Sequence, residues 1–228
     1  MKRAYFVTGT DTGVGKTLVS CALLRAFAAR GMTAVGMKPV AAGCEPHENG
    51  LCCEDVENLV AAGTVAAPRE WVNPYAFEPP VAPHIAAAQA GMEMDLGQIE
   101  SAFRKLQNLA DLVIVEGVGG FRVPLNERQD TADLAVALNL PVILVVGMRL
   151  GCLNLALLTA EAIRARGLNL AGWVANRVDP DMPLGVENRE ALERRLGCPL
   201  LGDLPYIQSD EKTIAELHLR LDKLIWDT

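Results

Sequence analysis

Short hydrophobic runs rich in valine and isoleucine alternate along the chain with longer stretches of helical periodicity. Continuous apolar runs of this length are typical of strands in a parallel sheet that is buried on both faces. We predict strands at Ala4–Thr8, Thr33–Met37, Asp111–Glu116, Pro141–Val146, Ala171–Ala175 and Leu200–Leu204. The alternation with helices indicates βαβ units. The sequence therefore predicts an α/β fold with a mostly parallel sheet covered by helices on both faces.

Helical periodicity fills the intervals between these runs, and several of the periodic stretches end at a glycine, a common residue after the last turn. We predict helices at Lys16–Ala29, Glu54–Ala62, Leu96–Leu109, Leu153–Arg166 and Val186–Leu196. The tail Ser209–Thr228 carries leucines and isoleucines at helical spacing, which predicts a C-terminal amphipathic helix.

The segment Ala66–Pro83 carries several prolines and turn-forming residues, and we interpret it as a long ordered loop over the sheet. A domain boundary there is the alternative. It is less favoured because the strands that precede the segment lack the partners for a sheet of their own. We therefore expect one domain over residues 1–228.

Composition and charge narrow the possible partners. The 228 residues are 50% hydrophobic and 21% charged, which is enough to bury a substantial core. The formal net charge of −7 would repel a nucleic-acid backbone, so any anionic ligand needs a few local cations. The apolar run Ala4–Val7 is too short for a secretory signal or a membrane span. We expect a cytoplasmic protein with neither nucleic-acid nor membrane partners.

The cysteines offer no metal-binding pattern. Six are present, none in a CxxC spacing, and the neighbours Cys52 and Cys53 lack the flanking pattern of a zinc site. We expect all six to be reduced and to serve as small core or loop residues.

A glycine-rich turn with phosphate-binding character lies between the first strand and the first helix. In GTDTGVGKT, Gly13 and Gly15 let backbone amides approach phosphate oxygens, because no Cβ is in the way. Lys16 is placed for the β and γ phosphates, and the Thr17 hydroxyl is placed for Mg²⁺. The sequence thus predicts a P-loop that binds a nucleoside triphosphate with magnesium.

The spacing of this loop differs from GxxxxGK[ST], because Thr10 stands where the first glycine is expected and Gly9 lies one residue early. We interpret the difference as the mark of a subfamily. A turn that merely joins a strand to a helix is the alternative, and the GKT ending argues against it.

Two further charged residues follow predicted strands. Glu116 ends DLVIVE and precedes a glycine-rich turn, which suits a ligand to Mg²⁺, directly or through water. Lys38 follows the second strand and shares an edge with the phosphate loop if the first two strands are parallel neighbours. Two lysines and a metal around one crevice favour attack of an oxygen nucleophile on the γ phosphate. A solvated acid and a surface lysine remain the alternatives.

These residues belong to a set of motifs that resembles the dethiobiotin synthetase family. The motifs are GTDTGVGKT, KPVAAG, VNPYAF, VEGVGG, VILVVGMRLGCLN and GWVAN, and the resemblance extends to about Tyr206. It implies a homodimer that uses ATP and Mg²⁺ to close a cyclic urea, the ureido ring, from 7,8-diaminononanoate and CO₂. The products would be dethiobiotin, ADP and phosphate.

The resemblance also implies roles for individual residues. Lys38, Lys16 and Thr12 would be catalytic, and Thr17, Asp55 and Glu116 would hold the metal. The nucleotide phosphates would lie against Gly13, Val14, Gly15, Lys16, Thr17 and Leu18. The nucleotide would also contact Gly117, Val118 and Gly119. From the residues alone, Asp55 is an acid favoured by the start of a helix, so its metal role comes from the resemblance.

The nucleotide base and the diamine would lie at other positions that the resemblance supplies. The base pocket would be formed by Asn176, Arg177, Pro205, Tyr206 and Ile207. The substrate carboxylate would meet the helix start at Gly151, Cys152, Leu153 and Asn154 across the dimer interface. At Ala42 the family usually carries a hydroxyl that contacts substrate, so a hydrogen bond worth about 1 kcal/mol is missing here or supplied elsewhere.

Other classes of P-loop protein are weaker matches. Regulatory ATPases of the partitioning type carry a second lysine early in the loop, where this chain has GTDT. A GTP-binding switch would read guanine through NKxD, and Asn176–Asp179 has that spacing, but Arg177 stands in place of the lysine. Glutamine amidotransferase relatives need an added catalytic domain for which this chain has no room.

Overall fold

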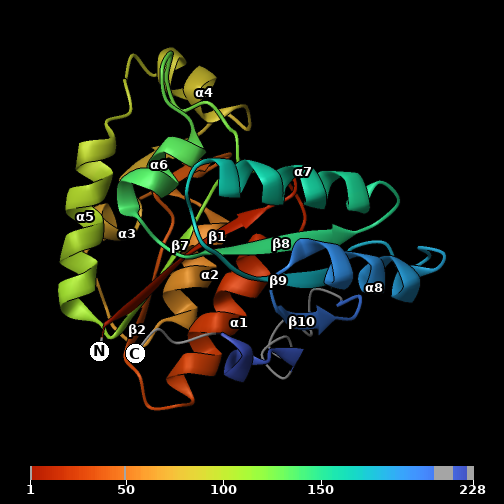
Figure 1. Cartoon of the computed structure of the whole chain (residues 1–228). Coiled ribbons are helices and arrows are strands. Elements are labelled where there is room, and N and C mark those ends of the chain that lie inside the picture. Colours follow the sequence, from red (N-terminus) through yellow and green to blue (C-terminus); the bar gives the residue numbers. More distant parts are fainter. Residues whose placement is uncertain (1, 49, 208–217, 225–228) are drawn as a thin grey trace.

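A six-stranded parallel sheet forms the centre of the molecule (Figure 1). The computed structural model describes residues 2–48, 50–207 and 218–224. The strand order is β10-β9-β8-β1-β7-β2, and every neighbouring pair is parallel. The strands span β1 Arg3–Gly9, β2 Ala34–Met37, β7 Leu112–Glu116, β8 Val142–Met148, β9 Leu170–Arg177 and β10 Leu200–Leu204. The predicted α/β fold is confirmed.

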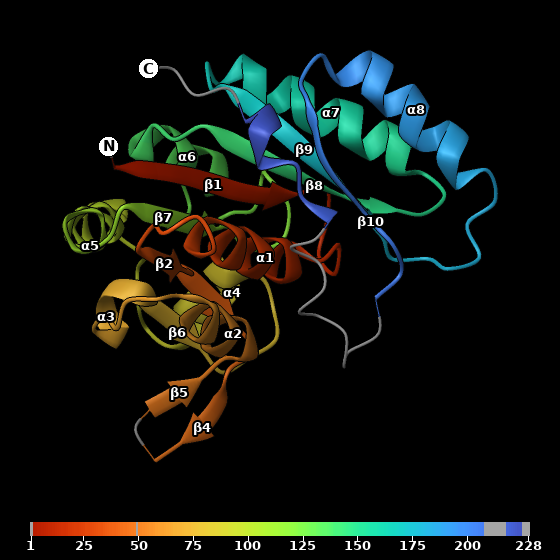
Figure 2. The same ribbon diagram turned by 90° about the horizontal axis from the view of Figure 1, so that it is seen from below.

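Helices cover both faces of this sheet (Figure 2). On one face lie α1 Lys16–Ala28 and α2 Glu54–Ala62, together with the 3-10 helix η2 Leu221–Lys223. On the other face lie α5 Leu96–Leu109, α6 Thr131–Leu138 and α7 Cys152–Ala165, with α8 Gly185–Leu196 packed beside α7. Among the described residues, no helix combines the length and apolar character needed to cross a bilayer.

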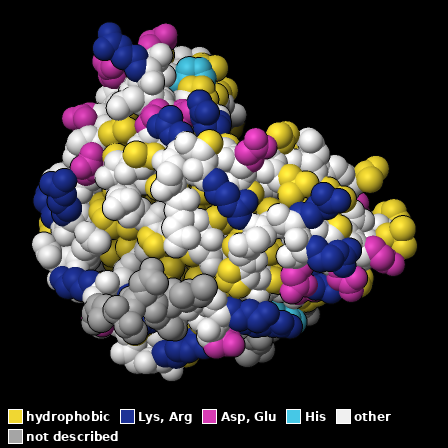
Figure 3. All heavy atoms as spheres, viewed as in Figure 1, with side chains coloured by type: hydrophobic (Ala, Val, Ile, Leu, Met, Phe, Trp, Pro, Cys, Tyr) yellow, Lys and Arg dark blue, Asp and Glu magenta, His cyan; other side chains and the backbone are white. Residues whose placement is uncertain are grey.

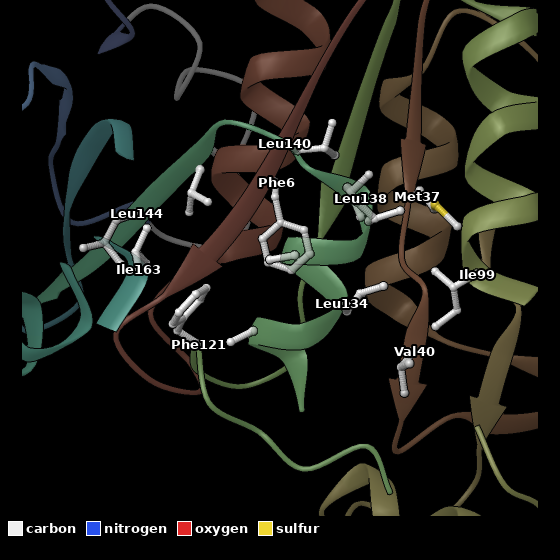
Figure 4. Packing of buried hydrophobic residues seen from close by; sticks show 14 of the residues in the cluster. Phe6, Met37, Val40, Ile99, Phe121, Leu134, Leu138, Leu140, Leu144 and Ile163 are labelled. Carbon is white, nitrogen blue, oxygen red and sulfur yellow. The ribbon is translucent and has the colours of Figure 1, made fainter. Parts of the chain in front are cut away.

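Alternate residues of the central strand β1 enter two separate cores. Phe6 packs into the core beneath α5, α6 and α7, whereas Tyr5 and Val7 pack into the core beneath α1. Figure 4 shows the Phe6 ring at the centre of the first core, near Phe121 and Leu134. Burial of both faces explains why the sequence of this strand is continuously apolar.

Smaller elements lie beyond the carboxyl end of β2. The strands β3 Val40–Ala42 and β6 Tyr75–Phe77 form a parallel pair, and β4 Glu45–His47 with β5 Gly50–Cys52 forms an antiparallel pair. Two short helices complete this region, α3 Arg69–Val72 and α4 Pro83–Gln89. On the face shown in Figure 3, acidic and basic side chains are interspersed.

The prediction of a long loop at Ala66–Pro83 is wrong, because this segment contains α3 and β6 and reaches the first residue of α4. Its structure depends on contacts that sequence patterns do not show. The Asn73 amide donates to the carbonyls of Lys38 and Tyr75, at 2.7 and 3.0 Å, and so ties the segment to the end of β2.

The predicted tail helix is also wrong where the structure describes it. Leu219 pairs with Gly202 at the edge of β10, and only the 3-10 turn η2 follows. The Arg220 amide donates to the Leu201 carbonyl at 2.6 Å, so the sheet edge takes the backbone bonds that a helix would have used. Leu221 is buried as the helical pattern anticipated, and residues 208–217 and 225–228 lie outside the described part of the chain.

The helix α6 was not predicted. It begins with a capping box in which the Asp130 carboxylate accepts from the Asp133 amide and Asp133 accepts in return. The usual sequence signal ends in Glu or Gln, and the acid here is one carbon shorter. The spacing of Asp130 and Asp133, two acids three residues apart, was the sequence signal that could have predicted the start of α6.

We predict that Phe6→Ala lowers the free energy of unfolding by about 3–5 kcal/mol, because Phe6 is fully buried between β1 and the helices of its core. Urea unfolding measures the change. Val60→Ala, at a side chain that is 48% exposed on α2, is the control and should stay within about 0.5 kcal/mol of the parent. Equal losses for the two variants would contradict the assigned core.

Candidate active site

The phosphate loop joins β1 to α1 through two glycines with left-handed backbones. Gly13 has a φ of 73°, and Gly15, the residue before α1, has a φ of 88°. Gly15 has no side chain with which to cap the first amides of helix α1. Uncapped amides at a helix start carry partial positive charge and form an anion-binding site.

Side chains beneath the loop fix its course. Val14 is buried, and a Cβ on Gly9 or Gly147 would come within 2.6 or 2.8 Å of its methyl groups. The Asn176 amide donates to the Val14 carbonyl at 2.9 Å, and a Cβ on Gly15 would lie 2.2 Å from that amide nitrogen. The glycine at position 9, one residue earlier than in the usual motif, therefore makes room for Val14.

A buried lysine joins two carboxylates beside this loop. Lys38 follows β2, and its Nζ lies 2.5 Å from Glu116 Oε1 at the end of β7 and 2.9 Å from Asp55 Oδ2 on α2. It also donates to the Gly117 carbonyl at 3.3 Å. Lys38 is 3% exposed and Glu116 is fully buried. Buried charges require such pairing, since isolated ones are costly to remove from water.

Thr17 brings a hydroxyl to the same carboxylates. Its Oγ1 lies 2.8 Å from Asp55 Oδ1 and 2.9 Å from Glu116 Oε1. A hydroxyl carries one proton, so it donates to only one of these oxygens at a time. Glu116 Oε2 is buried and has no hydrogen-bond partner among the described residues. Three oxygen-bearing side chains from separate elements thus converge with acceptor capacity to spare.

The cluster shifts the pKa values of its members in opposite directions. Burial and the Lys38 charge lower the pKa of Lys16 to about 8. Burial alone would lower the pKa of Lys38, but the carboxylates of Glu116 and Asp55 raise it above its ordinary value. Burial opposes the ionised form of Asp55, yet Lys38 and Thr17 hold its pKa below the usual value. Lys38 is thus held as a cation.

Both lysines line one cavity of about 420 Å³. Its other lining residues from the predicted site are Thr12, Gly13, Gly15, Thr17, Leu18, Ala42, Asp55, Val118 and Gly119. Lys38 was expected at the same edge of the sheet as the phosphate loop on the condition that β1 and β2 are neighbours, and this condition is not met, because β7 lies between them. Lys38 and the phosphate loop still lie at the same edge of the sheet, because all six strands are parallel. The intervening strand β7 is the one that ends at Glu116.

Several predicted site residues lie outside the cavity wall. Glu116 and the Gly117 carbonyl accept hydrogen bonds from the cavity-lining Lys38, and Asn176 donates to the Val14 carbonyl of the phosphate loop. Val14 is buried under the loop. Arg177 is the last residue of β9, Pro205, Tyr206 and Ile207 follow β10, and Gly151, Cys152 and Asn154 lie at the start of α7. Their roles stay predictions.

Cys152 has the environment of a structural residue. It is 1% exposed, and burial raises the pKa of its thiol. A nucleophilic cysteine needs a lowered pKa and access to substrate. All six cysteines are free of disulfides.

Sequence reasoning missed part of the cavity wall. Cys21 and Arg25 follow Thr17 at intervals of four residues, so helical spacing places all three on one face of α1 and was the available signal. The other missed lining residues are Ala41, Cys53, Glu54 and Asn58, around β3 and the start of α2. No local sequence pattern predicts that the start of α2 lies next to the phosphate loop.

Replacing the two loop glycines by alanine should have unequal effects. A Cβ at Gly13 meets nothing within 4 Å, so Gly13→Ala carries only the left-handed backbone cost of about 1–2 kcal/mol. Gly15→Ala carries a similar cost and also displaces Asn176. Urea unfolding without nucleotide should show the larger loss for Gly15→Ala. Equal losses would contradict the proposed contact between Gly15 and Asn176.

Comparisons with known proteins agree on the family and the fold. Residues 3–212 match the family model described as "AAA domain". A protein named ATP-dependent dethiobiotin synthetase BioD from Nitrosospira multiformis is 62% identical over 95% of each chain. The protein of the same name from Aromatoleum aromaticum is 56% identical over 96% of this chain and 97% of its own.

Solved structures of similar fold have much lower identity. The septum site-determining protein MinD from Pyrococcus horikoshii, complexed with Mg-ADP, has a TM-score of 0.57 at 16% identity, covering 94% of this chain and 86% of its own. The cell division protein FtsY from Thermotoga maritima has a TM-score of 0.52 at 17% identity, covering 96% and 69%. These likenesses establish the P-loop fold alone. With the sequence relatives, the motifs and the phosphate-loop geometry in agreement, the chain belongs to the ATP-dependent dethiobiotin synthetase family.

Proposed function

We propose that this chain closes the ureido ring of dethiobiotin from 7,8-diaminononanoate, CO₂ and ATP, as an ATP-dependent cyclo-ligase of biotin biosynthesis. The observation that carries the proposal is the cavity in which Lys16 and Lys38 meet beside an uncapped helix start. The high identity to two proteins named dethiobiotin synthetase supports the choice of substrate. A regulatory ATPase or GTPase switch is not favoured by these relatives.

The reaction needs no covalent bond to the protein. One amine of the diamine adds to CO₂ and loses a proton, which gives a carbamate. A carbamate oxygen attacks the γ phosphorus of ATP, the bond to the β-phosphate oxygen breaks, and ADP leaves. The second amine then attacks the carbamate carbon, loses a proton and expels phosphate as the ring closes. The protein must therefore supply position and charge.

Electrostatic repulsion is the main obstacle to the second of these steps, because the carbamate and the triphosphate are both anions. Lys38 is held as a cation by Glu116 and Asp55, at the wall of the cavity. Lys16 lies on the same cavity and extends from the phosphate loop. We propose that Lys16 neutralises the transferred phosphoryl group, that Lys38 stabilises the carbamate oxygen, and that Thr12 orients the carbamate.

Thr17, Asp55 and Glu116 are proposed to hold Mg²⁺. Mg²⁺ is usually bound by one or two carboxylates together with substrate phosphates, and this donor set matches. The buried Glu116 Oε2, which has no protein partner in the described chain, supports the fit. When bound, the ion would neutralise charge on the β and γ phosphates.

The nucleotide base is proposed to lie where β9 and β10 end, at Asn176, Arg177 and Pro205–Ile207. Leu204 pairs with Asn176 across these strands, which supports a shared pocket. The Asn176 amide donates to the Val14 carbonyl and retains a side-chain oxygen and a second N–H for adenine.

Ala42 lines the cavity but offers no hydroxyl to the diamine.

We further propose that the chain acts as one domain over residues 1–228 and as a homodimer in the cytoplasm, without nucleic-acid or membrane partners. The exposed leucines of α7 and the turn before it, Leu158 at 56% and Leu150 at 88%, support a subunit contact there. In such a dimer the helix start at Gly151–Asn154 would receive the substrate carboxylate of the partner's site. The net charge of −7 supports the absence of nucleic acid.

Incubation with the diamine, bicarbonate and Mg·ATP should yield the cyclic urea by mass, together with equal amounts of ADP and phosphate. Lys38→Met should lower kcat by about 100-fold or more, because a charge aimed at the transition state is lost. With the fold intact, nucleotide binding should persist, since the phosphate loop itself is unchanged. Lys105→Met, on the surface of α5, is the control. Product formation by Lys38→Met at the rate of the parent would remove Lys38 from the mechanism.

Glu116→Gln should raise the Mg²⁺ concentration needed for half-maximal ADP release by more than about 10-fold, because a carboxylate ligand is lost. The neutral amide also removes the charge of the ion pair between residue 116 and Lys38. Glu57→Gln is the matched control, since Glu57 lies on α2 and pairs with Arg69 instead. An unchanged Mg²⁺ requirement in Glu116→Gln would exclude Glu116 as a ligand.

A further inference from the structure

An ion pair outside the cavity joins the phosphate loop to the end of β8. Arg149 Nη2 lies 2.6 Å from Asp11 Oδ2, and the two side chains are 41% and 50% exposed. Neither residue lines the cavity. The pair joins two segments that are far apart in sequence, the turn after β1 and the turn before α7.

Asp11 in turn holds both catalytic candidates of the phosphate loop. Its other carboxylate oxygen, Oδ1, accepts from the Thr12 amide at 2.7 Å. Its backbone carbonyl accepts from Lys16 Nζ at 3.1 Å. The orientation of the Asp11 peptide and side chain therefore decides where the Thr12 backbone and the Lys16 ammonium lie.

Arg149 also belongs to the turn that opens α7. Its backbone carbonyl accepts from the Cys152 amide at 3.0 Å, and Gly151 between them has a left-handed φ of 95°. The backbone of Arg149 thus supports the helix start, while its side chain supports the phosphate loop.

We propose that Arg149 is a positioning residue that holds the phosphate loop in its nucleotide-binding form through Asp11. The proposal rests on the proposed function for the catalytic roles of Lys16 and Thr12, but its effect on nucleotide affinity is independent of the diamine. Arg149 acts through Asp11, because it does not itself reach the cavity. In the homodimer it would couple the nucleotide of one subunit to the helix start that serves the other.

The expected effect is small and specific. Exposed ion pairs contribute little, so loss of this one should raise the dissociation constant of Mg·ATP by about two- to five-fold. The KM for ATP should rise by the same factor. The kcat at saturating ATP should stay close to that of the parent, because bound phosphates themselves order the loop.

Three variants test this pair: Asp11→Asn, Arg149→Ala and the double variant. Asp11→Asn keeps an oxygen for the Thr12 amide and replaces the carboxylate oxygen that faces Arg149 with an uncharged NH2 group. Arg104→Ala is the control, since Arg104 is 73% exposed and pairs within α5. Binding of a fluorescent ATP analogue with Mg²⁺ is measured for each protein, with its unfolding temperature in the absence of ligand.

Both single variants should weaken nucleotide binding by the same factor, and the double variant should be no weaker than either. The difference from the parent should shrink at high salt, because the pair is exposed to screening. Their unfolding temperatures should match that of Arg104→Ala. Unchanged affinity in either single variant, or losses that add in the double variant, would overturn the proposal. If the parent binds ATP but makes no cyclic urea, the proposed function fails while this test of the loop remains valid.

Discussion

The buried ion pair between Lys38 and Glu116 is the constraint on which the rest of the site depends. It joins the carboxyl ends of two adjacent parallel strands, β2 and β7, and Asp55 completes it from α2. Removing one member of a buried pair leaves the other charge without compensation, at a cost of about 3–5 kcal/mol. The arrangement therefore ties three elements together, and it holds a cation at the wall of the cavity in which we propose that the carbamate is phosphorylated.

The parallel sheet explains how so few charges serve this chemistry. The carboxyl ends of β1, β7 and β2 lie at one edge of the sheet. The pairing of these three strands is therefore sufficient to place the phosphate loop, Glu116 and Lys38 next to one another. A similar fold occurs in solved structures named septum site-determining protein MinD and cell division protein FtsY. Function in this fold is thus a property of the residues at the edge.

Local signals made part of the site predictable from the sequence. The phosphate loop is a strand, a turn and a helix in succession, and Glu116 ends a strand whose apolar run is unmistakable. Asp55 differs, because only tertiary packing brings the start of α2 to the loop. The same limit applies to Asn73, whose amide ties the segment after α2 to the end of β2. Arg25 was predictable in principle from its spacing to Thr17.

The most direct test of the account is a crystal structure of the protein with Mg²⁺, a non-hydrolysable ATP analogue and the diamine carbamate. The account predicts that Lys38 Nζ contacts the carbamate oxygen while Lys16 Nζ contacts the terminal phosphate, with Glu116 at the metal. A structure in which Lys38 does not contact the carbamate, or in which Lys16 and Lys38 point away from a shared cavity, would contradict it.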